Sequence, residues 1–577
     1  METKNKGSHA EAKTGFASID RPQMKYYREE PIRNFDREQT VYDLIFKSNS
    51  GNMLSEAIGY LGDTLSFQEL KDAVDKTAEA YYNSGLRQGD VVTIMMMNTP
   101  EVPIIFLALN KIGAVSKWID AGVSPEDLCH YINEHQCKMA VTLDAVLLKI
   151  TAILDQTSLE KVLVISPKDF LSPNKNALIG EHNPSKISAK YVSFYTFIQN
   201  QENKSVPESQ YKASFDRNRL SLIIQSSGTT GKSKRIMHTD YSFTSLAHQV
   251  SYSDIPFVEK NTILVVLPPF VAFGLCNSLL IALSFGMKAE LSPTLEPKTV
   301  FDQLGKFNIC FGAPFLYRYL VEHNKEINRG DLKKVDVLFS GGDKLSIEEL
   351  NEFKSQLNHE LVNGWGNNEG LGAVTFNPTK ANKFGTIGIP KYGDTVIVIN
   401  SETGEELKYN EVGELCFCSD TSFMGYAGDE IGAKEVLRVH DDGKTWVHTG
   451  DLGSIDEEGY ITHLGRIQRV IVRMGFKTSP YTIEDKILSH PDVKECVVVG
   501  VPDKADDFVP MVFYCVSAGS DPNKIEQELI QTYCSKLTEY LIPKYYQCME
   551  ELPYTANNKY DFKLLEAMGA EYVENLG

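Results

Sequence analysis

LIIQSSGTTGKSK, residues 222–234, joins a short apolar run to a loop made almost entirely of hydroxyl-bearing residues, glycine and lysine. Leu222 to Ile224 is typical of a buried strand. Gly228 and Gly231 let backbone N–H groups approach phosphate oxygens, the hydroxyls donate hydrogen bonds, and Lys234 adds a positive charge. The stretch therefore predicts a buried strand that leads into a phosphate-binding loop.

The residues of this loop alone do not exclude two other interpretations. Gly231, Lys232 and Ser233 match the end of a Walker-type loop, but that motif needs a glycine where this chain has Ser226. A surface loop without a ligand has the same composition, because Ser and Gly are common in turns. Residues elsewhere in the chain have to decide between these interpretations.

Strand and helix patterns alternate around the loop. From Thr64 a helical pattern with apolar residues at helical spacing ends in a Gly-bounded turn, and a β-rich apolar run begins at Val91. Further apolar runs at 336–340 and 360–363 continue the alternation, which is typical of buried parallel strands in α/β layers. We expect a large, multi-layered α/β domain with parallel-type sheets.

The last 110 or so residues carry an α/β pattern of their own, about the size of a small domain. It includes VKECVVVGVPD (493–503), MVFYCVSA (511–518) and a helix expected around 526–541. A chain of 577 residues also exceeds the size of a single hydrophobic core. We predict an N-terminal extension (1–42), a large domain (43–464), a connecting segment (465–468) and a small α+β domain (469–577).

Composition excludes several classes of function. The net charge of −19 repels nucleic acids and anionic membranes. The ten cysteines show no zinc-site spacing, which favours reduced thiols and a cytoplasmic location. The N-terminus has no apolar segment of the secretory type. Residues 263–287 carry no charge and are long enough to span a bilayer, but Pro268 and Pro269 interrupt them, so we expect a buried strand and a core helix.

Eight further motifs follow the loop in order. They are LPPFVAFG (267–274), SGGDKL (340–345), NGWGNNE (363–369), GTIGIP (385–390), GEL (413–415), WVHTGD (446–451), the segment GRIQRVIVRMGFKTSPYTIE that begins at Gly465, and ELPYTANNKYDFK (551–563). With the loop, they resemble the adenylate-forming superfamily of acyl- and aryl-CoA ligases, nonribosomal peptide adenylation domains and beetle luciferases. The resemblance covers roughly residues 43–563 and is highly specific because the motifs keep the family's order.

The resemblance implies an AMP-forming ligase that uses ATP and Mg²⁺ to adenylate a carboxylic acid. The acyl group then passes to the thiol of coenzyme A or, as an alternative, of a carrier protein's pantetheine. The small domain is implied to be mobile and to swing about Gln468. Because the attacking carboxylate and the α-phosphate are both anions, catalysis rests on positioning and charge neutralisation.

Individual residues take roles by the same resemblance. Lys559 and the Mg²⁺ ligand Glu369 are the catalytic residues, and Gly475 borders the tunnel for the thiol. Phe270, Val271 and Gly364 line the acyl pocket. ATP or AMP is bound by Ser226, Ser227, Gly228, Thr229, Thr230, Gly231, Lys234, Gly342, Asp343, Asn363, Trp365, Gly366, Asn368, Asp451 and Arg466. Trp365 is placed against the adenine, and Asp451 accepts hydrogen bonds from the ribose hydroxyls.

Several positions depart from the family pattern. Asn368 replaces a threonine, Asn558 replaces the glycine before Lys559, and Arg235 replaces the glycine of the family's Pro-Lys-Gly ending. These departures motivate an alternative of another class, a non-catalytic relative that binds nucleotide or acyl ligand. Lys559, Glu369, Asp451 and Arg466 argue against it, and Val271 and Val472 argue against a luciferase-like oxidase.

Val271 also bears on the acid. Adenylation domains for α-amino acids carry an aspartate at this position, and a buried ammonium without that partner is heavily penalised. With Phe270 and Phe273 beside it, an apolar tail is favoured, so a fatty or aryl acid is the expected substrate. The sequence does not separate free coenzyme A from a carrier protein.

Overall fold

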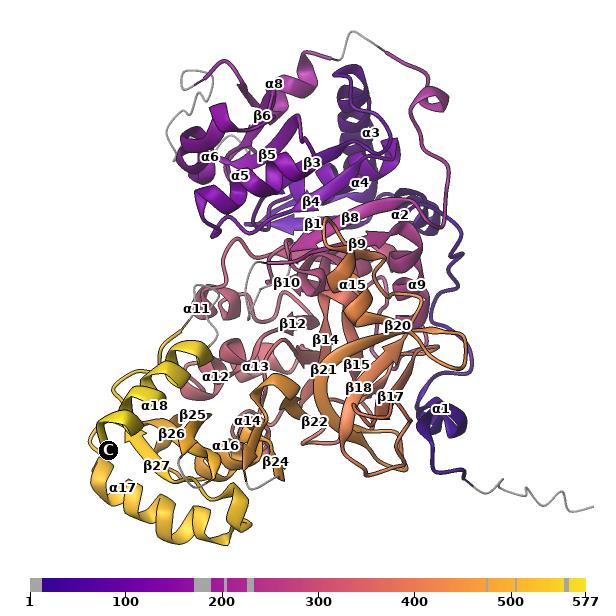
Figure 1. Cartoon of the computed structure of the whole chain (residues 1–577). Coiled ribbons are helices and arrows are strands. Elements are labelled where there is room, and N and C mark those ends of the chain that lie inside the picture. Colours follow the sequence, from indigo (N-terminus) through magenta and orange to yellow (C-terminus); the bar gives the residue numbers. More distant parts are fainter. Residues whose placement is uncertain are drawn as a thin grey trace, which may run out of the picture. The chain divides into compact units, whose positions relative to one another are not determined.

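The computed structural model describes residues 13–170, 188–201, 205–225, 233–473, 476–503, 506–554 and 560–576. Contacts between residues divide the chain into two units (Figure 1). The larger unit holds Tyr26–Asp394 and Cys418–Val447, and the smaller one holds Met1–Lys25, Thr395–Phe417 and His448–Gly577. The predicted fold class, a large α/β domain with a small C-terminal domain, is confirmed. The predicted domain bounds at 42, 464 and 468 stay predictions.

One sheet of the larger unit contains the strand predicted before the loop, which extends over β8 (Leu220–Gln225). Strands β8, β4, β3, β5, β6 and β7 are parallel neighbours in that order, and β9 and β19 extend the sheet antiparallel beyond β8. The bounds are β3 (Val91–Met95), β4 (Val115–Trp118), β5 (Met139–Leu143), β6 (Lys161–Ile165), β7 (Tyr191–Ser193), β9 (Arg235–Thr239) and β19 (Gly425–Tyr426).

Helices cover both faces of this sheet, as alternation along β6 shows. Val162 and Val164 pack in one cluster with residues of α5 (Pro125–Glu134) and α6 (Leu147–Ile153). Leu163 and Ile165 belong to the other cluster, which holds residues of α3 (Phe67–Asn83) and α4 (Glu101–Ile112). Successive strand side chains point to opposite faces, so a strand covered on both faces is apolar throughout.

A second sheet of the larger unit has the order β16-β15-β14-β13-β12-β10-β11-β1-β2. The strands from β14 to β1 in that order run parallel. The bounds are β1 (Glu56–Tyr60), β2 (Asp63–Ser66), β10 (Thr262–Val265), β11 (Lys288–Leu291), β12 (Ile309–Gly312), β13 (Val337–Ser340), β14 (Leu361–Asn367), β15 (Gly372–Phe376) and β16 (Ile389–Pro390). The predicted strands at 336–340 and 360–363 are confirmed as β13 and β14.

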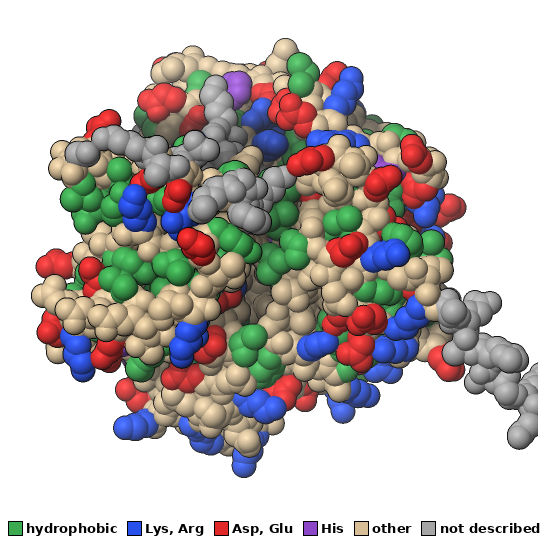
Figure 2. Space-filling view, turned by 60° about the horizontal axis from the view of Figure 1, so that its bottom comes forward, with side chains coloured by type: hydrophobic (Ala, Val, Ile, Leu, Met, Phe, Trp, Pro, Cys, Tyr) green, Lys and Arg blue, Asp and Glu red, His purple; other side chains and the backbone are tan. Residues whose placement is uncertain are grey.

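The uncharged run at 263–287 is part of the core, as predicted. It forms most of β10, a π-helical segment (Phe273–Leu280) and α10 (Ile281–Ser284), and most of its side chains are buried. Within the described part of the chain, no helix combines the length and the apolar character needed to cross a membrane. On the face seen in Figure 2, basic and acidic side chains are interspersed.

The remaining helices of the larger unit pack around the two sheets. α4 is buried along its whole length, and its core cluster includes Ile94 and Ile224 of one sheet and Ile263 of the other. The helices are α2 (Val41–Ser48), α8 (Phe194–Gln199), α9 (Asp240–Val250), α11 (Pro297–Phe301), α12 (Pro314–Glu322), α13 (Arg329–Leu332), α14 (Ile347–Leu357) and α15 (Glu430–Val436). The two sheets are thus layers of one domain.

In the smaller unit, β25 (Val493–Asp503) and β26 (Asp507–Val516) form a long antiparallel pair. The sequence indicates both segments but not their pairing. β23 (Ile471–Arg473), β24 (Phe476–Thr478) and β27 (Tyr545–Cys548) complete this sheet, with α16 (Pro480–Leu488) and α18 (Phe562–Leu576) packed on β25. The helix expected at 526–541 is shorter: α17 (Pro522–Glu528) gives way to π and 3₁₀ turns. Residues 532–534, Thr-Tyr-Cys, have low helix propensity, which accounts for the break.

A further set of strands carries the later motifs. β17 (Thr395–Ile399), β18 (Gly413–Cys418) and β21 (Thr445–Ile455) are neighbours, and β22 (Ile461–Arg466) pairs with β21. β20 (Leu437–Val439) pairs with the first residues of β21. The short helix α1 (Ala17–Asp20) belongs to the smaller unit.

We predict that Ser66→Ala loosens the start of α3. Ser66 Oγ accepts the Glu69 N–H at 3.2 Å, and Glu69 Oε2 accepts the Ser66 N–H at 2.8 Å, so the mutation removes half of a capping box. Loss of such a cap costs about 1 kcal/mol, or roughly a five-fold change in local opening. Hydrogen exchange of residues 67–70 measures it. Exposed Ser205→Ala is the control, and unchanged exchange in Ser66→Ala would contradict the capping role.

Candidate active site

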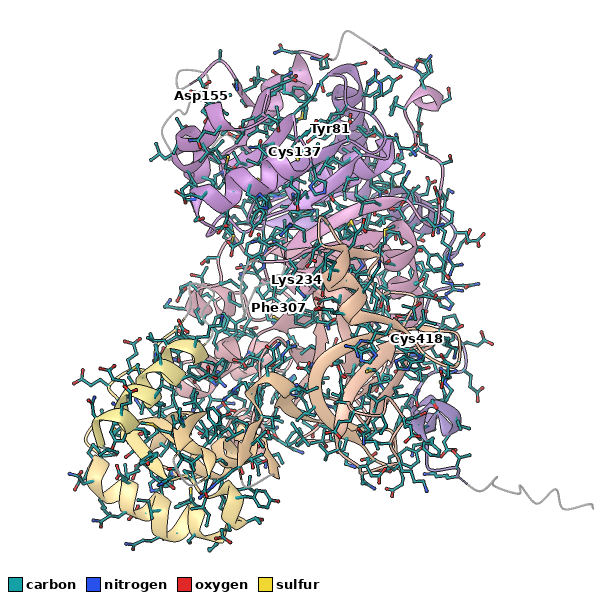
Figure 3. The ribbon with its side chains drawn as sticks, viewed as in Figure 1. Tyr81, Cys137, Asp155, Lys234, Phe307 and Cys418 are labelled. Atoms are coloured by element: carbon teal, nitrogen blue, oxygen red, sulfur yellow. The ribbon has the colours of Figure 1, made fainter. Side chains whose placement is uncertain are left out.

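The β8–β9 hairpin fixes where the predicted phosphate loop begins and ends. Gln225 pairs with Arg235, so the loop connects two neighbouring strand ends. The loop residues Ser226, Ser227, Gly228, Thr229, Thr230 and Gly231 lie outside the described residues, and their phosphate contacts stay predictions. Lys234 is described, and its Nζ lies 4.4 Å from the centroid of the Tyr426 ring (Figure 3).

Glu369, the predicted Mg²⁺ ligand, lies in a 3₁₀ turn after β14. Asn367 caps the turn, because its Oδ1 accepts the Gly370 N–H at 2.8 Å. Glu369 Oε1 accepts the Tyr426 hydroxyl at 2.8 Å, and its backbone oxygen accepts the Phe423 N–H at 2.8 Å. Burial and the nearby Glu369 carboxylate raise the pKa of Tyr426, so the phenol stays a donor.

Asn368 connects two segments of the predicted site. Its Oδ1 accepts the Ala272 N–H at 3.1 Å, and its Nδ2 donates to the Gln225 carbonyl at 3.1 Å. Its own backbone oxygen lies 2.7 Å from His238 Nε2. Burial lowers the pKa of His238 to about 4, so the ring is neutral near pH 7 and Nε2–H donates to Asn368. The phosphate contact predicted for Asn368 stays a prediction.

The predicted adenine-binding residues lie at the carboxyl ends of β13 and β14. Ser340 pairs with Asn363, so Gly341, Gly342 and Asp343 emerge beside Gly364 and Trp365. Asn363 is buried, and its Nδ2 donates to the Thr386 carbonyl at 3.2 Å. Asn363 Oδ1 is buried without a hydrogen-bond partner in the described part of the chain. An unsatisfied buried acceptor is costly, which makes this oxygen a candidate ligand contact.

Glycines at these strand ends are required by close packing. A Cβ at Gly364 would lie 2.3 Å from the Phe339 ring, and one at Gly366 would lie 1.9 Å from the Gly372 carbonyl oxygen. Gly342 differs, because nothing lies within 4 Å of its Cβ position while its φ of +92° favours glycine. Asp343 is exposed and its Oδ1 accepts the Lys344 N–H at 2.8 Å.

Aromatic rings lie among and beside the residues that are predicted to line the acyl pocket. Phe270 and Val271 are half-buried, and Phe273 follows at the start of the π-helical segment. The Phe273 ring lies 5.8 Å from that of Phe339, and a Cβ at Gly341 would lie 3.2 Å from it. The structure therefore brings the LPPFVAFG segment next to the SGGDKL and NGWGNNE segments, as an acyl pocket requires.

In the smaller unit, Asp451 and Arg466 are cross-strand partners on β21 and β22. Arg466 Nε lies 2.9 Å from Asp451 Oδ1, and Arg466 Nη1 donates to the Thr449 carbonyl at 3.1 Å. The side chain of Asp451 is 3% exposed and that of Arg466 is 53% exposed. The two predicted nucleotide contacts are therefore adjacent, with their roles still predictions.

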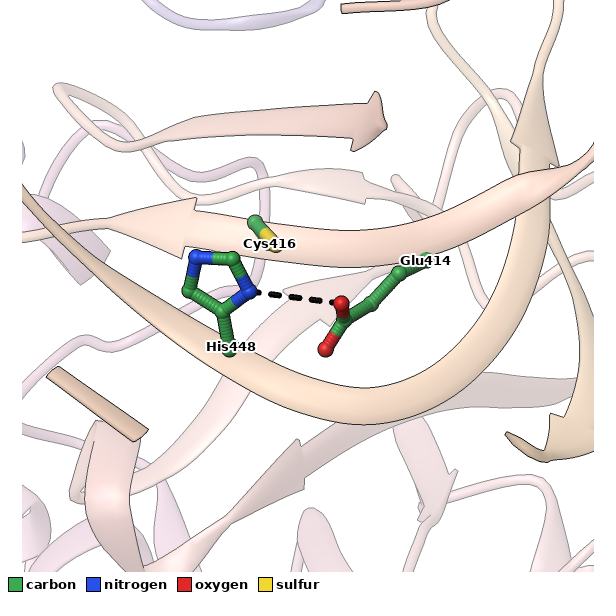
Figure 4. A group of neighbouring side chains, drawn as sticks. All are labelled: Glu414, Cys416 and His448. Carbon is green, nitrogen blue, oxygen red and sulfur yellow. Dashed lines mark hydrogen bonds and ion pairs between the residues drawn. The ribbon is translucent and has the colours of Figure 1, made fainter. Parts of the chain in front are cut away.

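Glu414 holds the turn before Asp451. Its Oε1 accepts the Gly450 N–H at 3.1 Å, and its Oε2 lies 3.3 Å from His448 Nδ1 (Figure 4). The ligand atoms of Glu414, Cys416 and His448 lie within 4.8 Å of one another, a spacing that a cation site would also have. Both oxygens of Glu414 already have partners, so hydrogen bonding explains the cluster without a metal ion.

The remaining predicted residues are distributed along the C-terminal part of the chain. Gln468 is exposed in a 3₁₀ turn between β22 and β23. Its neighbour Arg469 anchors that turn, because Nη2 donates to Glu484 Oε1 at 2.6 Å and the guanidinium lies 4.0 Å from the centroid of the Phe562 ring. Gly475 and Lys559 lie outside the described residues, so the thiol tunnel and the catalytic lysine stay predictions.

Sequence reasoning missed Tyr426, His238 and Glu414. Tyr426 belongs to a two-residue strand far from Glu369 in sequence, and no local pattern links the two. Glu414 lies in the GEL motif and His448 in the WVHTGD motif, so the motifs marked these segments but not the contact between them.

Comparison with known proteins identifies the family. The model of the AMP-binding enzyme family matches residues 47–427, and the model of the AMP-binding enzyme C-terminal domain matches residues 482–559. The chain belongs to the AMP-binding enzyme family. It is an enzyme of the AMP-forming, acyl-CoA-synthetase-like type.

Three relatives show how far the similarity extends. A long-chain-fatty-acid–CoA ligase of Bacillus subtilis (strain 168) is 26% identical over 513 residues, covering 87% of this chain and 90% of that protein. The 4-coumarate–CoA ligase CCL1 of Humulus lupulus is 27% identical over 523 residues, covering 88% and 90%. The structure of ATP-bound MatB from Rhodopseudomonas palustris superposes with a TM-score of 0.79 at 22% identity, covering 91% and 98%. The similarity thus extends over most of this chain and nearly all of each relative.

We predict that His238 makes folding sensitive to acid. Its folded pKa of about 4 is below the ordinary 6.5, so between these values the unfolded state binds a proton that the folded state excludes. Its contribution is therefore constant above pH 6.5 and is lost as pH falls towards 4, by about 1.4 kcal/mol per pH unit. His238→Gln keeps an amide donor near Nε2 and does not titrate.

Urea unfolding at pH 7.5, 6.0 and 5.0 measures this difference. The stability advantage of the wild type over His238→Gln should shrink as pH falls below 6.5. Parallel stability curves for the two proteins would contradict the assigned pKa direction.

We also predict that Glu414→Leu destabilises the smaller unit. It removes the carboxylate that accepts the Gly450 N–H and contacts His448 Nδ1, and the loss of such buried contacts costs about 1–3 kcal/mol. Chemical unfolding followed by hydrogen exchange of residues 448–451 measures the loss. Glu458→Gln, in an exposed ion pair with Lys25, is the control and should cost little. Equal effects of the two mutations would contradict the account.

Proposed function

We propose that this enzyme adenylates a carboxylic acid with ATP and Mg²⁺ and then transfers the acyl group to the thiol of coenzyme A. The observation that carries the proposal is the Glu369 carboxylate, one oxygen of which accepts the hydroxyl of Tyr426, while Lys234 Nζ lies 4.4 Å from the centroid of the Tyr426 ring. The family match supports the reaction class, and the CoA-ligase relatives support the acceptor.

Charge is the central problem of the first step. The acid's carboxylate attacks the α-phosphate, a bond forms between its oxygen and phosphorus, and pyrophosphate leaves. Two anions approach each other, so positive groups must lie nearby. Lys234 follows the predicted phosphate loop directly, and Lys559 is the proposed second cation. Thiolysis of the resulting acyl-adenylate then releases AMP.

Glu369 fits the role of a Mg²⁺ ligand. Mg²⁺ in nucleotide sites is bound by one or two carboxylates together with phosphate oxygens. Glu369 Oε1 is taken by Tyr426, and Oε2 has no partner among the described residues. When bound, the ion would neutralise phosphate charge during the attack. The carboxylate of Glu369 would hold it from the protein side.

Three groups support the nucleotide part of the proposal. The unpartnered Oδ1 of Asn363 can accept a hydrogen bond from an adenine amino group. Asp451 is nearly buried and offers carboxylate oxygens to ribose hydroxyls. Arg466 restrains that carboxylate and keeps most of its own guanidinium exposed. Trp365 and Gly366 on β14 complete the proposed base-binding strand.

For the acid substrate and the cellular location, we propose only a class of acid and a compartment. Half-buried Phe270 and Val271 favour an apolar acyl group, so we propose a fatty or aryl acid. A carrier protein's pantetheine is the alternative acceptor. The ten cysteines all lie in the described part of the chain and none of them forms a disulfide, which supports action in the reducing cytoplasm.

Acid-dependent ATP–pyrophosphate exchange tests this function directly. We expect exchange with fatty or aryl acids and not with amino acids, and AMP release when coenzyme A is added. Glu369→Gln should reduce exchange by about 10²–10³-fold, the usual cost of removing a preorganised electrostatic group. Glu322→Gln, an exposed residue of α12, should leave it unchanged.

The outcomes separate the alternatives. Nucleotide binding without exchange for any acid would indicate a non-catalytic relative. Exchange without AMP release on adding coenzyme A would favour a carrier protein. Lys559→Ala should impair adenylation far more than thiolysis of a supplied acyl-adenylate, and equal losses would contradict its assignment to the first step.

A further inference from the structure

Tyr426 is held in place by its own strand. In β19 it pairs with Ile236 of β9, and Gly425 pairs with Met237. The side chain of Tyr426 is only 3% exposed, and its hydroxyl reaches Glu369 Oε1 at 2.8 Å. We propose that Tyr426 is a positioning residue that orients the Glu369 carboxylate for a nucleotide-bound Mg²⁺. The proposal rests on the role of Glu369 proposed above.

The contact between Tyr426 and Glu369 is braced on several sides. The Phe423 N–H donates to the Glu369 backbone oxygen at 2.8 Å, and the Phe423 ring lies 4.8 Å from that of Tyr426. Lys234 Nζ lies 4.4 Å from the Tyr426 ring centroid, within the range of a cation–π contact. Backbone, ring and hydroxyl of this short segment thus all restrain the turn that carries Glu369.

Arg235, the first residue of β9, holds β9 and β19 together through its side chain. Its Nη1 donates to the Ser233 carbonyl at 2.8 Å and its Nη2 to the Ala427 carbonyl at 3.2 Å. Its guanidinium also forms a two-pronged ion pair with Glu134, with Nε–Oε distances of 3.0 and 3.1 Å. Glu134 in turn lies 3.0 Å from the buried Lys117 Nζ.

We call these contacts of Arg235 with Ser233, Ala427 and Glu134 the Arg235 clamp. The clamp explains why an arginine stands where the family pattern has glycine. The Arg235 side chain links Ser233, which precedes β9, and Ala427, which follows β19, to Glu134 at the end of α5. In addition, the Ala427 N–H donates to the Arg235 carbonyl at 2.8 Å. Ala427 follows Tyr426 directly. Arg235 therefore positions Tyr426, which positions Glu369.

The hydrogen bond from Tyr426 to Glu369 Oε1 affects how Glu369 can bind a metal ion. A carboxylate that accepts a fixed hydroxyl on Oε1 cannot rotate freely, so Oε2 keeps one direction for a cation. A glutamate without that donor must be ordered when the metal binds, which reduces affinity. Removing such a supporting hydrogen bond commonly costs roughly ten- to hundred-fold in metal affinity.

The test compares Tyr426→Phe with a matched control. Tyr426→Phe keeps the ring and removes only the hydroxyl. Tyr195→Phe removes a hydroxyl that donates to a different carboxylate, that of buried Glu101, at the same 2.8 Å. The probe is Mn²⁺ in the presence of α,β-methylene-ATP. This analogue cannot transfer its AMP group to an acid, because a methylene group replaces the oxygen between its α- and β-phosphorus atoms. Electron paramagnetic resonance of free Mn²⁺ gives the affinity without any turnover.

We expect Tyr426→Phe to weaken Mn²⁺ binding on the order of ten-fold, and Tyr195→Phe to leave it unchanged. In pyrophosphate exchange, the Mg²⁺ midpoint of Tyr426→Phe should rise similarly, and saturating Mg²⁺ should restore most of the rate. Arg235→Gly should shift the affinity in the same direction. Loss of fold alone would lower the rate at every Mg²⁺ concentration.

The proposal is overturned if Tyr426→Phe binds Mn²⁺ as tightly as the wild type, or if Glu369→Gln does. Normal affinity in Arg235→Gly alone would overturn the clamp. Because Mn²⁺ binding needs no acid, failure of the proposed function is seen separately. A wild type that binds Mn²⁺ and nucleotide through Glu369 but exchanges with no acid would refute the function and leave the role of Tyr426 intact.

Discussion

The side-chain hydrogen bonds of Asn368 are the constraint on which the rest of the candidate site depends. One amide group joins the end of β8, through the Gln225 carbonyl, to Ala272 at the entrance of the proposed acyl pocket. The next residue is Glu369. Because His238 donates to the Asn368 backbone oxygen, the turn is also tied to β9. The segments predicted to bind the phosphates, the acyl group and Mg²⁺ are thereby joined through Asn368.

This arrangement follows from the topology of the two sheets. Parallel strands bring their carboxyl ends to one edge, where loops rather than strand interiors present functional groups. β13 and β14 deliver Gly341 and Gly364 side by side. A Cβ at Gly364 would lie 2.3 Å from the Phe339 ring, so glycine is needed there, and one at Gly341 would lie 3.2 Å from the Phe273 ring. Asn363 Oδ1 is buried beside these glycines and has no hydrogen-bond partner among the described residues.

The sequence predicted the elements that carry local patterns and missed contacts between distant segments. β8 was identifiable from three apolar residues before the loop. Asp451 and Arg466 were each identifiable from a motif, and the structure shows that they lie opposite each other on adjacent strands. Arg235 and Glu134 are 101 positions apart, and nothing in the local pattern links them. The helix expected at 526–541 was too long, because Thr532, Tyr533 and Cys534 within it have low helix propensity.

Attack of the acid's carboxylate on the α-phosphate of ATP is tested most directly by isotope transfer. An acid labelled with ¹⁸O in both carboxylate oxygens is incubated with enzyme, ATP, Mg²⁺ and coenzyme A, and the products are analysed by mass spectrometry. The account predicts one ¹⁸O atom in AMP and none in pyrophosphate. Label in inorganic phosphate together with ADP, or unlabelled AMP, would contradict it.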